Sequence, residues 1–163
     1  MQRAAEDVDI HALDLGHLAL FVGEAYNRAV LRALAEAGLG DLRTAHGYLI
    51  QHLLRGPHRL GDLAARLGVS QQAVSKLAAE LVSAGYLARD ADPDDARVVV
   101  LSLTARAMGA VELARLTRAE LDASLRDQLG AERVQGAREL LAGALEALGM
   151  GEEVRGRRVR GAG

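Results

Sequence analysis

Apolar residues recur at helical spacing over the first part of the chain, in the segment IHALDLGHLALFVGEAYNRAVLRALAEAGLG. The positions that carry this pattern are Ile10, Leu13, Leu18, Phe21, Val22, Ala25, Val30 and Leu34. An apolar side chain every three or four residues predicts an amphipathic helix, which Gly38 and Gly40 end. A second helix is predicted over residues 43–55 and ends at Gly56-Pro57, because proline cannot continue a helix.

Two shorter helices with a tight break between them follow. The segment LGDLAARLG places Leu60, Leu63, Ala64 and Leu67 on one face, and Gly68 is a natural stop. Ser70 is then a good N-cap for the next helix. That helix has an apolar face (Val74, Leu77, Leu81 and Val82) and an opposite face made of Gln71, Gln72, Ser75, Lys76 and Ala79. Its polar start therefore faces away from the core.

The chain then changes from helical to strand periodicity. YLARD and RVVVLSL are typical of two strands, and ADPDDA between them has the turn residues of a hairpin loop. Helical patterns resume from Thr104 and again over residues 132–148, and the basic segment 150–163 is predicted to be disordered. The fold class predicted is mainly α with a small β-hairpin wing: a winged helix-turn-helix with further helices at both ends.

In such a fold the second helix of the pair enters the major groove of DNA and presents its N-terminal residues to base edges. Glutamines such as Gln71 and Gln72 bond bidentately to adenine, and Lys76 reaches phosphate or guanine. The alternative is an ordinary surface helix whose polar residues are merely solvated. The hairpin at the expected distance favours the DNA-binding interpretation.

Charge and composition narrow the function further. The net charge is −2, yet residues 43–102 hold seven bases and six acids, four of which lie within residues 90–95. The rest of this middle region is therefore basic, as a DNA partner requires. There is no cysteine, which excludes a disulfide, a thiolate metal site and a cysteine nucleophile.

Several other classes of protein are not favoured. The sequence has no Gly-rich phosphate loop, nucleophile elbow or paired metal-ligand motif, so we expect no enzyme activity, no catalytic residue and no cofactor. No apolar run approaches the roughly 20 residues that span a bilayer, and the N-terminus lacks the apolar stretch of a signal peptide. A cytoplasmic protein with no membrane partner is expected.

Residues 60–104, LGDLAARLGVSQQAVSKLAAELVSAGYLARDADPDDARVVVLSLT, resemble the core of the multiple-antibiotic-resistance regulator (MarR) family. The wing motif of that family is matched by Asp95-Ala96-Arg97 and by Leu103-Thr104, although Ala96 stands where an arginine is usual. The resemblance implies that Arg97 enters the minor groove and that Asp95 holds the shape of the wing. The predicted DNA-binding residues are then Ser70, Gln71, Gln72, Ser75, Lys76, Arg89 and Arg97.

The same resemblance implies a homodimer that represses genes at pseudo-palindromic operators and responds to a small-molecule effector. We expect a flexible N-terminus over residues 1–9, dimerisation helices over 10–42 and 104–149, and a DNA-binding lobe over 43–103. The apolar faces of the dimerisation helices exceed what a small winged domain can cover, so a partner must bury them. An adaptor protein with this fold but without DNA binding remains an alternative.

An effector pocket is implied at the junction of the dimerisation helices and the DNA-binding lobe, lined from the first, second and fifth helices. Its candidate lining residues are His17, Phe21, Tyr26 and His46, each of which simple packing also explains. A zinc-responsive regulator is a further alternative, since histidines together with carboxylates such as Glu24 can bind zinc. Against it, no two histidines stand three or four residues apart and none follows His58, so no metal site is predicted.

Overall fold

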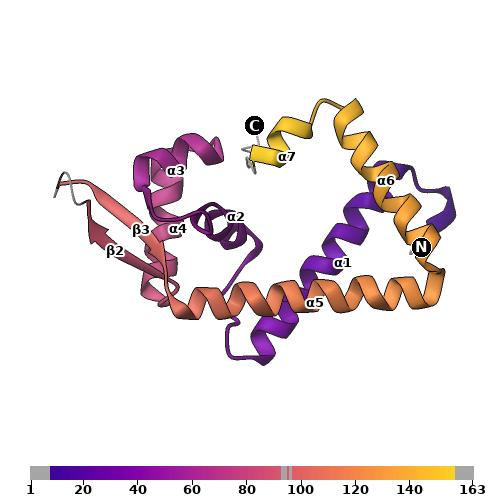
Figure 1. Cartoon of the computed structure of the whole chain (residues 1–163), viewed down its shortest axis with the longest axis horizontal. Coiled ribbons are helices and arrows are strands. Elements are labelled where there is room, and N and C mark those ends of the chain that lie inside the picture. Colours follow the sequence, from indigo (N-terminus) through magenta and orange to yellow (C-terminus); the bar gives the residue numbers. More distant parts are fainter. Residues whose placement is uncertain (1–7, 93–94, 96, 157–163) are drawn as a thin grey trace, which may run out of the picture.

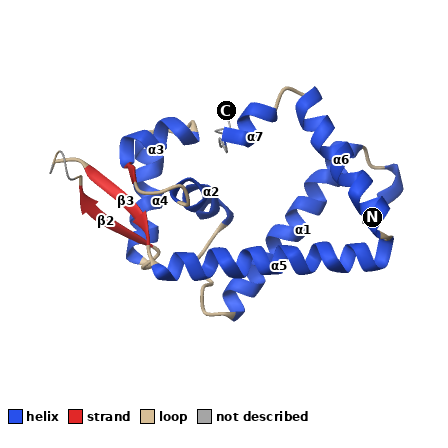
Figure 2. Cartoon of the chain, viewed as in Figure 1, coloured by secondary structure: helices blue, strands red, loops and turns tan. Residues whose placement is uncertain are grey.

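The computed structural model describes residues 8–92, 95 and 97–156, and within them helices dominate (Figure 2). The elements, in chain order, are η1 (Ile10–Ala12), α1 (Leu15–Glu36), α2 (Thr44–Leu53), β1 (His58–Arg59), α3 (Leu60–Leu67), α4 (Gln71–Ser83), β2 (Leu87–Ala91), β3 (Val99–Leu103), α5 (Ala105–Leu129), α6 (Ala131–Ala147) and α7 (Gly151–Gly156). The predicted fold class, a mainly helical chain with a small wing, is confirmed.

The wing is a three-stranded antiparallel sheet of order β1-β3-β2, and not only the hairpin that the sequence predicts. β2 and β3 pair from Leu87 opposite Leu103 to Ala91 opposite Val99. The added strand β1 places His58 opposite Leu101. It is two residues long, so it carries no periodicity by which the sequence alone reveals it.

The helix-turn-helix forms where its local signals predict. α3 ends at Gly68, whose φ of 69° is a left-handed conformation that favours glycine. The Ser70 side chain then accepts a hydrogen bond from the Ala73 N–H at 3.2 Å and caps α4. The fully buried side chains that fix these helices against the sheet are Val74, Leu49, Leu63, Leu67, Leu81, Leu101 and Tyr86. α4 is thus held on its inner face by the core of the lobe.

The long helix α5 runs from the wing to the opposite end of the molecule, and α1 crosses it midway (Figure 1). The N-cap of α5 is Thr104, whose side chain also donates to the Gly85 carbonyl at 2.8 Å. Further along, the Tyr26 hydroxyl donates to Asp122 at 2.7 Å and joins α1 to α5. This crossing connects the winged lobe to the rest of the chain.

Large apolar side chains are exposed on the helices outside the lobe. They include Leu15, Leu20, Phe21 and Val22 of α1, Leu116 and Leu129 of α5, and Leu140, Leu141, Leu145 and Leu148 at α6. No residue of α6 is buried. These faces are not covered by any other part of the chain that the structure describes.

The segment after α6 differs from the prediction of a disordered tail from residue 150. Residues 151–156 form the short helix α7, and the remainder of the basic segment lies outside the described residues. Among the described helices none is both long and apolar enough to cross a membrane.

Candidate nucleic-acid interface and ligand cavity

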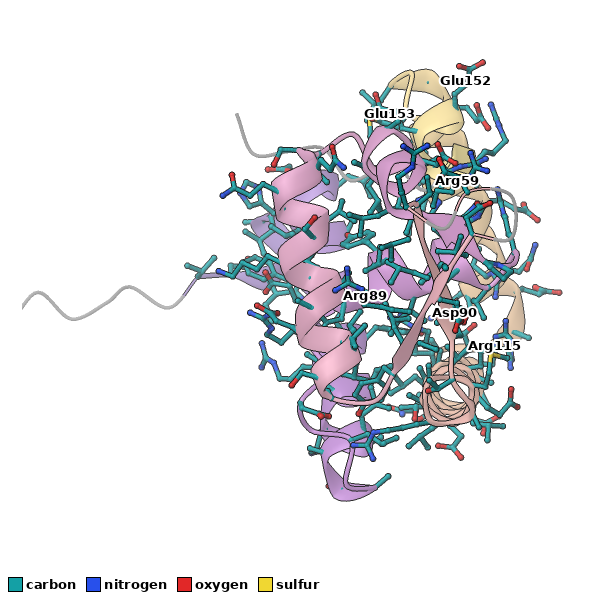
Figure 3. All side chains as sticks on the ribbon, turned by 90° about the vertical axis from the view of Figure 1, so that its left-hand side faces the viewer. Arg59, Arg89, Asp90, Arg115, Glu152 and Glu153 are labelled. Atoms are coloured by element: carbon teal, nitrogen blue, oxygen red, sulfur yellow. The ribbon has the colours of Figure 1, made fainter. Side chains whose placement is uncertain are left out.

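The start of α4 is a polar, exposed surface on a rigidly held helix. Ser70, Gln71, Gln72 and Lys76 are exposed, and Ser75 is half-buried. The opposite face, which includes Val74, is buried in the lobe. Figure 3 looks onto this end of the molecule, where α4 stands beside the strands of the wing. The residues predicted to contact bases therefore share one accessible face.

The tip of the wing presents Arg97 to solvent. The Arg97 side chain is 92% exposed, and its Nε donates to Asp95 Oδ1 at 3.2 Å. The Arg97 backbone N–H donates to the same oxygen at 3.0 Å, so this carboxylate holds the turn in shape. Asp94 and Ala96 lie outside the described residues. The geometry fits the roles that the resemblance implies for Asp95 and Arg97.

A second acidic residue of the wing, Asp92, forms an ion pair with Arg59 of β1. Asp92 is buried, and its Oδ2 accepts from Arg59 Nε at 2.6 Å. The pairing reduces the negative charge that the acidic hairpin would otherwise present to DNA. Arg89 is exposed on β2 next to the exposed Asp90, and both are labelled in Figure 3.

Behind α4, a polar cluster ties this helix to the start of α2. His46 is buried, and its Nδ1 accepts the Arg43 backbone N–H at 3.2 Å, so the ring proton belongs on Nε2. That Nε2 donates to Glu80 Oε2 on α4 at 3.0 Å, and the Arg43 guanidinium also pairs with Glu80. The hydrogen bond from His46, and then the charge of Arg43, lower the pKa of Glu80.

A similar cluster lies where the loop before α2 meets α5. The hydroxyl of the buried Tyr86 donates to Asp41 Oδ1 at 2.6 Å. Arg106 lies over the Tyr86 ring, 4.8 Å from its centre. The hydrogen bond from Tyr86 is the main cause that lowers the pKa of Asp41.

These two carboxylates predict acid sensitivity of the lobe. A depressed carboxylate pKa stabilises the folded state at pH values above the unfolded pKa, and the stabilisation is lost as pH falls through the folded pKa. We expect the free energy of unfolding to fall as pH drops below about 4. In Glu80→Gln and Asp41→Asn this fall should be smaller, measured by urea unfolding at several pH values. Glu36→Gln, at an exposed position near the end of α1, is the control and should retain the wild-type pH dependence.

A cavity of about 240 Å³ lies between α1, α2 and α5. Its apolar surface comes from aliphatic side chains, namely Val30, Leu31, Leu34, Leu42, Ile50, Leu54, Val111, Ala110 and Ala114. Three arginines also line it: Arg43, Arg115 and Arg118. An apolar cavity with several guanidinium groups suits a small amphipathic anion.

None of the four candidate pocket residues lines this cavity, although it lies between the three predicted helices. His17 and Phe21 are exposed on the N-terminal half of α1. Tyr26 is bonded to Asp122, and His46 to Glu80. The prediction selected aromatic and histidine side chains, whereas the lining is aliphatic and arginine-rich, and no local pattern distinguishes those residues from core or surface.

The histidines also do not gather into a metal site. His17 Nδ1 lies 2.6 Å from Asp14 Oδ2 at the start of α1, far along the chain from His46 and its partner Glu80. Over the residues that the structure describes, no group of three or more histidine or acidic side chains is placed to hold a metal ion.

Comparison with known proteins gives consistent matches. A family model described as "MarR family" matches residues 40–98. The HTH-type transcriptional regulator YcgE of Bacillus subtilis is 45% identical over 51 residues, which are 31% of this chain and 33% of that protein. The match thus spans about a third of the length of that curated relative.

Solved structures match over most of the chain. The YusO protein of Bacillus subtilis has 25% identity, covers 82% of this chain and 92% of its own, and superposes with a TM-score of 0.65. A mutant of S. aureus MepR bound to an oligodeoxyribonucleotide has 20% identity, covers 83% of this chain and 99% of its own, and has a TM-score of 0.61. The latter shares the fold.

Proposed function

Because this chain belongs to the MarR family, we propose that it is a sequence-specific DNA-binding transcriptional regulator that acts as a homodimer and represses genes at a pseudo-palindromic operator. One observation carries the proposal: α4 and the strands of the wing lie at the same end of the molecule (Figure 1), and both the polar start of α4 and the Arg97 side chain are exposed. With this arrangement α4 can lie in the major groove as the recognition helix while Arg97 of the wing enters the neighbouring minor groove. The fold shared with DNA-bound MepR supports the same arrangement.

The uncovered apolar faces of α1, α5 and α6 support the dimer. An interface between two copies that buries these faces should exceed roughly 2,000 Å², as obligate dimers do. In this arrangement residues 10–42 and 104–149 dimerise, and residues 43–103 form the DNA-binding lobe. Two recognition helices related by a two-fold axis then match two operator half-sites.

The direct test is binding to the promoter region next to the protein's own gene. Footprinting should find a protected site with two related half-sites, and fluorescence anisotropy should give affinity that falls steeply with salt. An adaptor protein without DNA binding, the alternative class, would show neither protection nor salt-dependent binding to any duplex. Added zinc should leave operator affinity unchanged unless the metal-responsive alternative holds.

A small-molecule effector is the second part of the proposal, and the cavity between α1, α2 and α5 is its site. Arg43 lines this cavity and also pairs with Glu80 on α4. An anionic ligand that attracts the Arg43 guanidinium competes with Glu80 for it. The ligand would thus act on the position of α4, by as much as its affinity differs between the DNA-bound and free conformations.

Glu80→Gln tests this connection. We expect benzoate, an amphipathic anion of suitable chemistry, to lower the operator affinity of the wild type by about ten-fold. In Glu80→Gln the amide still accepts hydrogen bonds but carries no charge for Arg43, so benzoate should change operator affinity by less than about three-fold. The measurement is anisotropy with and without ligand, together with calorimetry to verify that benzoate still binds. A wild-type response in the variant would place the connection elsewhere.

A further inference from the structure

The turn after α6 sends the chain back toward the winged lobe. Gly149 has a φ of 74°, a left-handed conformation that favours glycine. The Met150 N–H donates to the Leu145 carbonyl at 2.8 Å, and the Gly149 N–H to the Glu146 carbonyl at 3.0 Å. As Figure 1 shows, α7 consequently lies on the side of the molecule that α2 occupies, and not beyond the far end of α6.

The Glu146 carboxylate braces α7 in this position. Gly151 is buried so close to it that a Cβ at this position would overlap the carboxylate. At the other end of α7, Arg155 Nη1 pairs with Glu146 Oε1 at 2.6 Å. The last turn of this short helix is thus tied to α6 by an ion pair, and its first residue packs beside the same carboxylate.

A second chamber of about 400 Å³ lies between α2 and α7. Tyr48 on α2 and Met150 and Val154 at α7 supply its apolar surface, and Glu153 of α7 also lines it. It shares five lining residues with the cavity between α1, α2 and α5, namely Asn27, Thr44, Gly47, Gln51 and Arg118. The two chambers therefore adjoin, and α7 bounds the outer one.

We propose that α7 completes the ligand site and that the site takes an elongated amphipathic carboxylate. This inference rests on the proposed effector site and adds to it the length of the ligand. The carboxylate lies in the cavity between α1, α2 and α5, which Arg43 lines, and near Arg118, the arginine that lines both chambers. The hydrocarbon chain extends into the outer chamber, where it packs against Met150 and Val154 and is buried from solvent.

The test is a series of straight-chain carboxylates from butanoate to octanoate, titrated by calorimetry into the full-length protein. In the wild type, affinity should rise by about four-fold for each added methylene group that becomes buried. In Val154→Asp a charge stands on the wall that the hydrocarbon meets. Octanoate should then bind at least about ten-fold more weakly than to the wild type, while butanoate and benzoate bind as before.

Two matched variants separate this effect from damage to the fold. Val8→Asp makes the same substitution at an exposed valine that precedes the dimerisation helices and lines neither chamber, and it should keep the wild-type dependence on chain length. Val154→Leu keeps the wall of the outer chamber apolar, so this variant should also keep the wild-type dependence of affinity on chain length. Thermal unfolding of each variant verifies that the fold is intact.

Three results would overturn the proposal: no rise of affinity with chain length in the wild type, the same rise in Val154→Asp, or no binding of any carboxylate. Operator binding by anisotropy is measured on the same samples. If the affinity of the wild type does not rise with chain length but the wild type still binds operator and benzoate, only the proposed role of α7 is removed. Absence of operator binding by the wild type would instead remove the proposed function.

Discussion

Replacing Leu141 and Leu145 together by aspartate is expected to convert the proposed dimer into a monomer. The two side chains stand one turn apart on α6 and are exposed in the single chain. Each loses apolar burial at the interface and places a carboxylate there, and both changes occur twice in a two-fold dimer. We expect the dissociation constant of the dimer to rise by roughly a thousand-fold or more.

Sedimentation at micromolar concentration measures the assembly state, and circular dichroism verifies the helices. Ala65→Asp is the control, because Ala65 is also an exposed apolar residue but lies on α3, within the DNA-binding lobe and outside the segments proposed to dimerise. That variant should remain a dimer. A stable folded monomer of the wild type at the same concentration would contradict the proposal at once.

Operator affinity should fall with the dimer. A monomer presents one recognition helix and loses the gain from binding the second half-site within the same complex, which is worth about a hundred-fold or more. Relative to the wild type, the double variant should lose much affinity for the full operator and little affinity for a single half-site. Equal losses on both would indicate that the substitutions damage the lobe instead.

The second large effect concerns the two modes of DNA recognition. Arg97→Ala should weaken binding to most sequences, because a wing arginine contributes charge and senses a narrow minor groove. The slope of log affinity against log salt should become shallower by about one unit per protomer. The loss is increased by Asp95, whose carboxylate pairs with Arg97 and would then face DNA without a partner guanidinium.

Gln71→Ala and Gln72→Ala should behave differently, since both side chains are exposed at the start of α4 and are uncharged. The salt slope should stay nearly unchanged. One of the two should cost about 1–3 kcal/mol on the operator and relax the preference at one base pair in each half-site.

Affinities at several salt concentrations, on operator and scrambled duplexes, distinguish these patterns. Arg32→Ala, an exposed arginine of α1 paired with Glu36, is the control and should leave both quantities unchanged. If both glutamine variants keep the wild-type ratio of operator to scrambled affinity, this face of α4 does not discriminate bases.

The sequence by itself determined the features that depend on neighbouring residues. The boundaries of α3 and α4 follow from Gly68 and from the Ser70 cap, which act within one helical turn. The apolar face of α4 and its polar start follow from helical periodicity, and both lie as predicted. The Asp95–Arg97 contact spans two residues, so it too is local.

Only the tertiary structure decided which distant side chains meet. Arg59 and Asp92 are 33 residues apart, and Arg43 and Glu80 are 37 apart, so each pairing depends on how separate elements pack. The same holds for the cavity, whose aliphatic and arginine lining comes from three helices with no shared local pattern. Likewise α7 is too short to carry a periodic signal, and its place across the outer chamber from α2 depends on the turn at Gly149 and on the ion pair of Arg155 with Glu146. Local chemistry predicts elements and their caps, whereas contacts between elements require their relative positions, which only the folded chain defines.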